Sequence, residues 1–450
     1  MASRARPGGP PRSRRLRSCA VLLFLCIAGP ARAAPLPLAE LDRLALADEA
    51  GVAALEARAL AARERAVADA QLPDPVLSVG ALNFPVDTFA FDRERMTQLR
   101  LGLRQQFPGA DTRERRRARG EAVAEGHEAS SALRRRQVLR AAREAWLAVL
   151  WRLEERALLE AEGPRLRILE ETALAGYREG AGSQQDVLRA RLERDALEER
   201  LLRNGEALDV ARAELARWIG EAALGADPVP PVDGSSLDPA PLLALGPEQL
   251  RARLAGHPAI RARAARIDEA EATVGLARAD YRPAWALEVG YGLRDELSPM
   301  GDTPDFLSAI VSVELPLFPD RRQDRRLAAA RAERESARAE RIDALRELER
   351  DWRTLQARHT RLAARRALQA GTIEPRTAQS ARAALEAYRA DAGDFPEVVR
   401  AVLAGLDVRL ELVRLEHELR RVAAQLAWLL APDPERGAAN GTDPAPEEDA

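Results

Sequence analysis

The residues best placed to contact a ligand or partner lie in two related segments, YREGAGSQQDVLRA at 177–190 and YRADAGDFPEVVRA at 388–401. Each joins a tyrosine, a glycine-containing turn and an acid. That combination suits recognition and electrostatics more than bond-making chemistry. The chain shows no phosphate-binding glycine loop, nucleophile elbow or paired catalytic carboxylates. Four histidines lack the spacing of metal ligands, so we expect no enzyme, cofactor or metal site: His127, His257, His359 and His417.

The two segments are copies of one turn. Shifted by 211 residues they agree at seven positions, and the acids Asp186 and Glu397 also align. Tyr177 aligns with Tyr388, and other matches at a shift of 210 or 211 continue through most of the chain. A repeat of this length indicates that one structural unit occurs twice.

The repeat defines the expected domain boundaries. We expect the first copy at 34–220 and the second at 247–431. The segment between them, 221–246, is rich in proline, glycine and aspartate and is typical of a linker. The acidic tail at 432–450 is low in apolar residues, which predicts disorder.

The amino-terminal segment has the features of an export signal. Residues 1–33 combine an arginine-rich start, an apolar stretch and a small-residue cleavage site. They hold seven arginines and no acid, so the rest of the chain carries a formal charge of −9 instead of −2, which argues against nucleic-acid binding. Both cysteines, Cys19 and Cys26, lie here, so the mature chain has no disulfide. The large residues before Cys26 fit a lipoprotein signal poorly.

Four stretches alternate apolar and polar side chains with a period of two, at about 76–84, 96–106, 284–293 and 306–316. This pattern predicts strands with one apolar and one polar face. Each stretch is about ten residues long, which matches the ~9–11 tilted residues that a strand needs to cross a bilayer. No apolar run reaches the ~20 residues of a membrane-spanning helix. If the chain crosses a membrane, these strands must do so.

Helical patterns surround each strand pair. A helical stretch precedes it, at 38–71 or 246–281, and a long tract follows it, at about 110–177 or 320–388. At ~1.5 Å per residue, such a tract would reach on the order of 100 Å. Return helices are expected at about 184–220 and 395–431.

Apolar residues in these helices recur at spacings of three and four, which predicts a coiled-coil seam. In the first repeat the seam comprises Leu139, Ala142, Trp146, Val149 and Leu153, with Leu197, Leu201, Asn204, Leu208, Ala211, Leu215 and Trp218 in the return helix. Pro164 and Pro375 occupy equivalent places, and we expect each to bend or break its helix.

The turns and the strand number both constrain the assembly. Gly180, Gly182 and Gly393 are expected to let the backbone reverse, and Ser183 to cap the return helix. Four strands cannot close a barrel, and lipid does not tolerate an open strand edge. Three copies would supply twelve strands around an aqueous lumen, whereas two would supply eight around a filled bore.

An ordered set of motifs, repeated in the chain, carries a family resemblance: LPDPVLSVG at 72–80, RQQFPG at 104–109, the turn from Tyr177 to Asp186, YRPAWALEVGYG at 281–292 and LPLFPD at 315–320. Over about 40–430 the chain resembles the TolC-like outer-membrane efflux protein family. The resemblance implies a mainly α protein with membrane β-strands, internally duplicated, whose homotrimer combines a long coiled-coil helical barrel with a 12-stranded β-barrel.

The same resemblance implies a location and a function. The β-barrel would sit in the lipid of the outer membrane of a Gram-negative bacterium, and the helical barrel in the periplasm. The channel-tunnel would be the passive exit duct of a tripartite efflux or type I secretion system, supplied by an inner-membrane pump through a periplasmic adaptor. It would perform no chemistry and use no cofactor. Few methionines and histidines give no support for metal-specific binding, and heavy-metal, drug, solvent and protein cargo stay open.

The resemblance also assigns roles to the two turns, as the periplasmic tip where the adaptor docks and the tunnel narrows. The docking residues would be Tyr177, Gly180, Gly182, Ser183, Asp186, Tyr388 and Gly393. Glu397, Arg400 and Asp391 are candidates for the pore constriction. A ring of Glu397 side chains would favour cations, or Glu397 is an ordinary first-turn acid of its helix. Asp391 replaces a glycine of the family pattern, and Arg400 an acid of some members.

Other features have two readings each. Phe107 and Phe318 would join an aromatic girdle at the periplasmic membrane interface, or pack in a core. Arginine clusters would attract anions at the junction of barrel and tunnel, or form a solvated helix face: Arg113, Arg115, Arg116, Arg117, Arg321, Arg322, Arg325 and Arg326. The alternative functions are a periplasmic adaptor, which normally has one hairpin flanked by β-domains, and a structural coiled-coil protein, which would leave the strands without a purpose.

Overall fold

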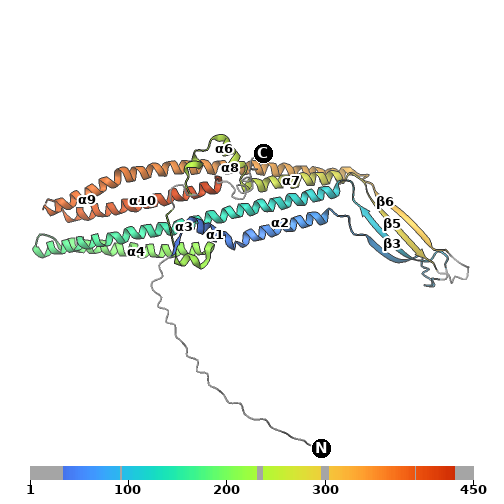
Figure 1. Cartoon of the computed structure of the whole chain (residues 1–450), viewed down its shortest axis with the longest axis horizontal. Helices are drawn as coiled ribbons and strands as arrows, with labels where there is room; N and C mark the ends of the chain where they lie inside the picture. Colours follow the sequence, from blue (N-terminus) through green and yellow to red (C-terminus); the bar gives the residue numbers. More distant parts are fainter. Residues whose placement is uncertain (1–33, 92–93, 231–236, 295–303, 391, 431–450) are drawn as a thin grey trace, which may run out of the picture.

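The protein is elongated, with two helical hairpins at one end and a small sheet at the other (Figure 1). The computed structural model describes residues 34–91, 94–230, 237–294, 304–390 and 392–430. The export signal expected at 1–33 and the tail expected at 432–450 lie outside this range. Helices fill the space between the two ends, and the hairpins of both repeats point the same way.

The first hairpin consists of α3 (Thr112–Glu179) and α4 (Gln184–Ile219). The 68 residues of α3 correspond to about 100 Å of helix. The predicted seam is confirmed along its centre, where Trp146 and Leu215 are fully buried. Its one polar member, Asn204, is also buried and donates from Nδ2 to the Arg152 carbonyl at 3.2 Å, which fixes α4 against α3.

The second hairpin consists of α8 (Gln323–Leu368), a π-helical turn η3 (Gln369–Ile373), α9 (Glu374–Arg389) and α10 (Phe395–Leu430). The two prolines behave differently. Pro375 follows η3 in the first turn of α9, where its missing N–H is not needed. A bend or a break was expected at Pro164, and the break is wrong, because α3 continues through this residue. Buried Leu159 and Leu166 pack on either side and hold the helix together there.

Shorter helices lead into each strand pair, at positions close to those expected. The first repeat has α1 (Leu38–Ala47) and α2 (Ala50–Asp69), and the second has α6 (Pro247–Ala255) and α7 (Pro258–Ala279). Helix α2 packs along α3, and α7 packs against both α3 and α8. Helix α7 therefore joins the two repeats in the part of the molecule next to the sheet (Figure 1).

The segment between the repeats is more ordered than its composition suggested. It contains a 3-10 helix η1 (Gly220–Gly225), a short strand β4 (Ala226–Pro228) and a short helix α5 (Ala240–Leu243). Strand β4 pairs in parallel with β1 (Ala34–Leu36) at the start of the described chain. The segment is thus tied to the first repeat by a backbone ladder that its prolines did not indicate.

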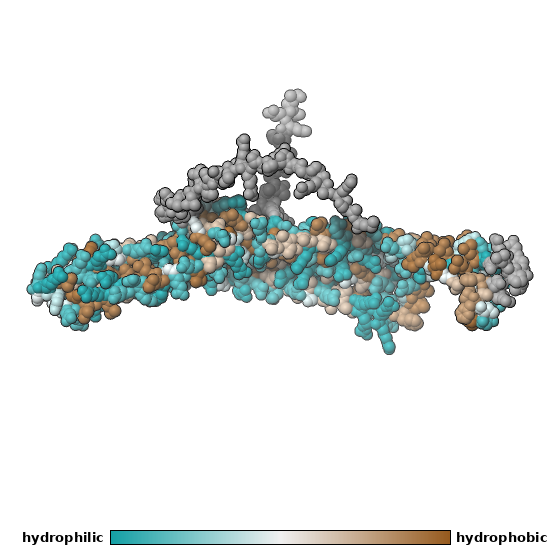
Figure 2. All heavy atoms as spheres, turned by 90° about the horizontal axis from the view of Figure 1, so that it is seen from below, coloured by the Kyte–Doolittle hydropathy of each residue, from teal (hydrophilic) through white to brown (hydrophobic). Residues whose placement is uncertain are grey.

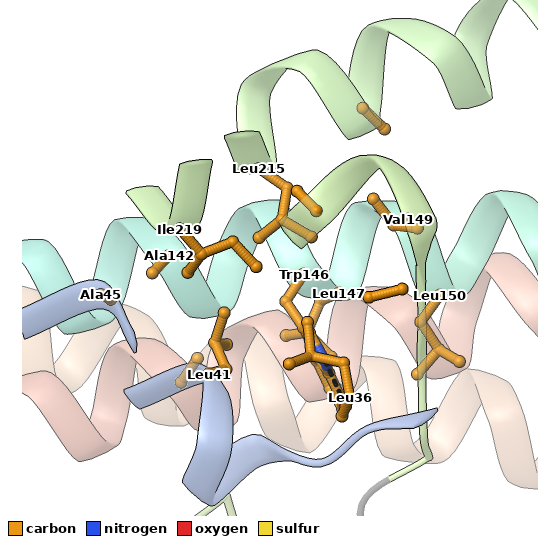
Figure 3. Close-up of a cluster of buried hydrophobic side chains, with 14 of the residues drawn as sticks. Leu36, Leu41, Ala45, Ala142, Trp146, Leu147, Val149, Leu150, Leu215 and Ile219 are labelled. Carbon is orange, nitrogen blue, oxygen red and sulfur yellow. Dashed lines mark hydrogen bonds between the residues drawn. The ribbon is translucent and has the colours of Figure 1, made fainter. Parts of the chain in front are cut away.

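One buried part of the core lies where β1, α1, α3 and α4 meet (Figure 3). Trp146 is fully buried at its centre, and its Nε1–H donates to the Leu36 carbonyl at 3.0 Å. Leu41 from α1 and Leu215 from α4 are also fully buried in this cluster. The ring therefore joins three helices and the first strand in one contact set.

A four-stranded antiparallel sheet forms the other end of the molecule, in the order β2 (Val76–Leu82), β3 (Gln98–Phe107), β5 (Ala284–Leu293), β6 (Phe306–Glu314). The central pair, β3 and β5, joins the two repeats. Within the described residues, β2 and β6 each have one edge without a strand partner. None of the helices in the described ranges is both long and apolar enough to span a bilayer.

Candidate membrane sheet and hairpin tips

One face of the sheet is apolar across all four strands. The register places Val79 opposite Leu101, Leu101 opposite Tyr291, and Tyr291 opposite Leu307. These side chains are exposed in the protomer, and Val79 is 66% accessible. Hydrophobic atoms gather over the strands, whereas hydrophilic atoms predominate over the hairpins (Figure 2). We call this surface the apolar face: Leu77, Val79, Ala81, Leu99, Leu101, Leu103, Leu287, Val289, Tyr291, Leu293, Leu307, Ala309, Val311 and Val313.

The opposite face carries small and charged residues at its centre. Ser78, Gly102, Gly290 and Ser308 form one row across the strands. Arg100 reaches diagonally over Gly290 to Glu288, with Nη2 and Oε1 2.9 Å apart. A Cβ at Gly290 would lie only 2.7 Å from Arg100 Nε, so the glycine makes room for this ion pair between β3 and β5. Sequence alternation indicated the polar face but not this pairing.

Aromatic side chains mark the helical end of the apolar face. Phe107 stacks on Trp285, its register partner, with ring centroids 4.0 Å apart and an interplanar angle of 14°. Phe318 lies beyond the end of β6 and is 86% exposed, so core packing within the protomer does not explain it. Trp285 was not among the interface aromatics expected from the sequence, although the alternation of side chains along β5 places it on the apolar face.

The first hairpin turn, Tyr177–Asp186, is held by its own backbone and side chains. Gly180 ends α3 in the left-handed region with φ of 76°, which glycine adopts without strain. Ser183 caps α4 as expected: its Oγ accepts from the Asp186 N–H at 3.2 Å, and Asp186 Oδ2 accepts from the Ser183 N–H at 3.1 Å. Tyr177 is half exposed beside this turn. Ser183 and Asp186 therefore have a structural role independent of any partner.

Gly182 and Gly393 serve the turns differently from expectation. Neither has a left-handed φ; instead each lies close to the preceding helix end. A Cβ at Gly182 would lie 3.2 Å from the Tyr177 nitrogen, and one at Gly393 would lie 3.2 Å from the Tyr388 nitrogen. The two repeats thus use the same close approach at equivalent residues, and a side chain at either would push the turn away from its helix.

The structure brings the two turns together. Tyr388 packs edge-on against Phe395, with centroids 5.6 Å apart. A Cβ at Gly176 would lie 3.6 Å from the Tyr388 hydroxyl, so the second turn touches the first. One buried cluster includes Val187 from α4 and Val398 from α10. The tip is therefore one unit built from both repeats.

The residues expected at a pore constriction are only partly described. Asp391 lies outside the described residues. Glu397 and Arg400 lie in the first turns of α10, and Arg400 Nη1 donates to Glu397 Oε2. Both side chains are exposed. Within one protomer this pairing offsets the charge of Glu397, which favours its reading as a first-turn helix acid.

A buried ionic contact between the hairpins was missed by the sequence reasoning. Glu162 of α3 is fully buried, and its Oε2 accepts from Arg409 of α10 at 2.6 Å and from Arg165 at 3.2 Å. The sequence could have revealed this acid, because Glu162 lies three residues after Leu159 and four before Leu166, at the spacing of the buried seam. A groove of about 670 Å³ lies beside it between α3, α9 and α10.

The buried histidines are structural. Burial lowers the pKa of His257 and of His417 to about 4, so both are neutral at neutral pH. His257 accepts from the Ala259 N–H at 3.2 Å and caps α7, and His417 stacks on Trp151 with centroids 4.7 Å apart. No group of three or more metal-binding side chains occurs in the described ranges.

Together these features define a class of protein: a duplicated, mainly helical subunit with long hairpins and a small sheet that is apolar on one face. The profile of the outer membrane efflux protein family matches residues 250–431, which fall in the second repeat. No curated protein matches the chain.

Solved structures of outer-membrane channels share this fold over most of both chains. The outer-membrane channel OprN is 19% identical, with 88% of this chain and 91% of that chain covered and a TM-score of 0.72. VceC from Vibrio cholerae is 18% identical, with 87% and 94% covered and a TM-score of 0.71. CmeC from Campylobacter jejuni is 13% identical, with 89% and 88% covered and a TM-score of 0.70. The resemblance to the TolC-like outer-membrane efflux protein family is confirmed.

Proposed function

We propose that the chain is the outer-membrane channel-tunnel of a tripartite efflux or type I secretion system, a passive exit duct that performs no chemistry. The observation that carries the proposal is the exposed apolar face, which no other described residue covers and which is long enough to face the lipid of a bilayer. The family match and the shared channel fold support the same function.

The open edges of the sheet support a closed assembly of several copies. Within the described residues, neither β2 nor β6 has a strand on its outer edge. An edge in lipid leaves backbone N–H and C=O groups without partners, so β6 of one copy would pair with β2 of the next. A homotrimer gives twelve strands and an aqueous lumen, as a duct requires.

Exposed apolar residues on helix α4 also support contact with a second copy of the chain. Its buried residues Leu197, Leu208 and Leu215 face α3. Four exposed apolar residues lie on the opposite side, as the ~100° turn per residue shows, with charged Asp195, Glu199 and Glu206 among them: Leu188, Leu192, Leu202 and Val210. A neighbouring protomer would cover these apolar side chains.

The proposal places the sheet in the outer membrane and the hairpins in the periplasm. The joined tip, Tyr177–Asp186 with Tyr388–Glu397, would meet a periplasmic adaptor that connects the duct to an inner-membrane pump. Helices of about 100 Å are suited to crossing that space. The duct would receive its cargo from the pump, so the cargo class is set elsewhere.

Planar-bilayer recording tests the channel directly. The detergent-purified protein is expected to migrate as a trimer and to conduct ions after reconstitution. In cells it is expected to stay with outer membranes after high-salt washing. A water-soluble monomer that conducts no ions and is removed by salt would instead indicate an adaptor or a structural coiled-coil protein.

Substitutions at the two tip glycines test the docking role. Gly182→Leu and Gly393→Leu place a side chain against the end of the preceding helix, which displaces the turn. We expect pump-dependent resistance to fall at least about tenfold in the double variant, a factor that corresponds to ~1.4 kcal/mol of lost docking. The measurement is the minimum inhibitory concentration of a pump substrate, at trimer levels matched by immunoblot.

Gly205→Leu is the matched control, because a Cβ at Gly205 on α4 has no atom within 4 Å. It is expected to leave resistance unchanged. Unchanged export in the double tip variant, with normal trimer levels, would contradict the docking role.

A further inference from the structure

We propose that arginines at the junction of sheet and helices bind the phosphate groups of anionic phospholipids in the membrane leaflet nearest the hairpins. This proposal rests on the proposed membrane location of the sheet. The junction arginines are five arginines in the segments after β3 and β6 whose side chains are exposed and have no ion pair or hydrogen bond among the described residues: Arg113, Arg116, Arg321, Arg322 and Arg325. The side chain of Arg115 also has none among those residues, but it lies against Gly275 of α7 and is not counted with them.

Their lack of partners distinguishes them from nearby arginines. Arg117 pairs with Glu121 at 2.8 Å, and Arg326 pairs with Asp280 at 3.4 Å. Two of the four acids of these segments are also occupied, because Asp111 Oδ2 accepts from Arg282 at 2.6 Å and Asp324 accepts from the Tyr281 hydroxyl. The junction arginines therefore have donors available for an external anion.

The two segments carry a local positive charge although the mature chain is acidic. Residues 111–117 contain four arginines and two acids, and residues 319–326 contain the same numbers. Each segment thus has a formal charge of +2, against −9 for the chain after residue 33. A local excess of this sign favours a negatively charged surface over a neutral one.

Their position relative to the apolar face points to lipid. At the helical end of that face, one row crosses three strands through Phe107, Trp285 and Val313. Leu317 and Phe318 follow, 68% and 86% exposed, and the arginines of 321–325 come next in the chain. In membrane proteins, apolar surface contacts the hydrocarbon, aromatic rings lie at the interface, and cationic groups contact the headgroups. The residues at this end of the sheet follow the same order.

The geometry suits phosphate in particular. A guanidinium presents several N–H donors in a plane and binds phosphate oxygens in pairs, whereas a solvated helix face requires no such grouping. Arg321 and Arg322 are adjacent, and Arg325 lies one turn further into α8. Several arginines per protomer, repeated in each copy, would form a belt around the channel below the hydrocarbon region.

Lipid binding to the purified protein tests the belt. The delipidated trimer in non-ionic detergent is titrated with phosphatidylglycerol or phosphatidylcholine, and bound lipid is counted by native mass spectrometry. We expect a clear preference for phosphatidylglycerol. Each arginine near an anionic surface strengthens binding about fivefold, so the triple variant R321Q/R322Q/R325Q is expected to lose at least about tenfold in this preference.

The matched control is R346Q/R358Q/R361Q. These three arginines also lie exposed on α8 and have no ion pair with any described residue, and the nearest to the sheet is 23 residues past the start of the helix, or about 35 Å. The control is expected to keep the wild-type preference. Trimer content and far-ultraviolet circular dichroism verify that both triple variants fold.

Three results would overturn the belt. If the wild-type channel conducts ions but binds both lipids equally, the arginine belt is contradicted and the proposed function is not affected. A junction variant with altered ion selectivity and unchanged lipid binding would place these arginines in the lumen instead. Failure of the wild type to insert into any bilayer would reject the membrane location itself, and with it the belt.

Discussion

Val79→Arg is expected to prevent stable insertion of the protein into the outer membrane. Val79 lies on the apolar face in the row with Leu101 and Tyr291, and it is 66% exposed in the protomer. An arginine on the lipid side of a membrane strand costs roughly 2–4 kcal/mol near the bilayer midplane. A trimer carries the change three times, so the total is roughly 6–12 kcal/mol, comparable to the stability of a whole domain.

Gly80→Arg is the matched control, one residue along the same strand. Gly80 points to the opposite face, and a Cβ there meets no atom within 4 Å. The same charge is added at the same depth, but toward the proposed lumen, where water solvates it. We expect normal trimers and a changed ion selectivity, because lumen charges act on passing ions.

The measurement is the amount of trimer in outer-membrane fractions, followed by single-channel recording of whatever protein is recovered. Loss of trimer in Val79→Arg but not in Gly80→Arg would establish which face meets lipid. Equal insertion of both variants would contradict the membrane role of the apolar face, and with it the proposed function.

The elements of the fold could be predicted because each depends on a local pattern. Period-two alternation placed the strands within about two residues of β2, β3, β5 and β6. The 3,4 spacing located the buried seam of α3 and α4, including Asn204. The repeat helped to place the remaining elements, because corresponding segments of the two copies were expected to form the same helices and strands.

Errors arose where tertiary contacts override a local signal. Proline normally interrupts a helix, but at Pro164 the buried neighbours Leu159 and Leu166 keep α3 continuous. The proline-rich segment after α4 was expected to be a simple linker, yet its β4 finds a ladder partner almost two hundred residues earlier, in β1. Such pairings join distant parts of the chain, so no periodic pattern in the local sequence predicts them.

The candidate site was predictable in outline but not in detail. The duplicated turn located the tip, and Ser183 was expected to cap α4; the reciprocal hydrogen bond that Asp186 accepts from the Ser183 N–H was not predicted. The role of Gly182 was assigned to backbone freedom, whereas the structure shows close approach, because φ and crowding cannot be separated from sequence. The pairing of Arg100 with Glu288 crosses between the repeats and required the strand register.

Trp146→Ala is expected to destabilise the helical part of the protein by ~3–5 kcal/mol, the range for truncation of a buried aromatic ring. Trp146 is fully buried where β1, α1, α3 and α4 meet, so its loss leaves a cavity against all four elements (Figure 3). The measurement is thermal unfolding in detergent, followed by circular dichroism at 222 nm, a wavelength at which helix dominates.

Two further variants separate packing from hydrogen bonding. Trp146→Phe retains most of the ring but removes the donor to the Leu36 carbonyl, so the expected loss is smaller, ~1–3 kcal/mol, with selective release of β1. Trp218→Ala at the half-buried edge of the same cluster is the control for truncation itself. If Trp146→Ala unfolds no earlier than Trp218→Ala, the ring does not organise this core. If Trp146→Phe leaves the amino-terminal segment as resistant to protease as in the wild type, the hydrogen bond to Leu36 does not anchor β1.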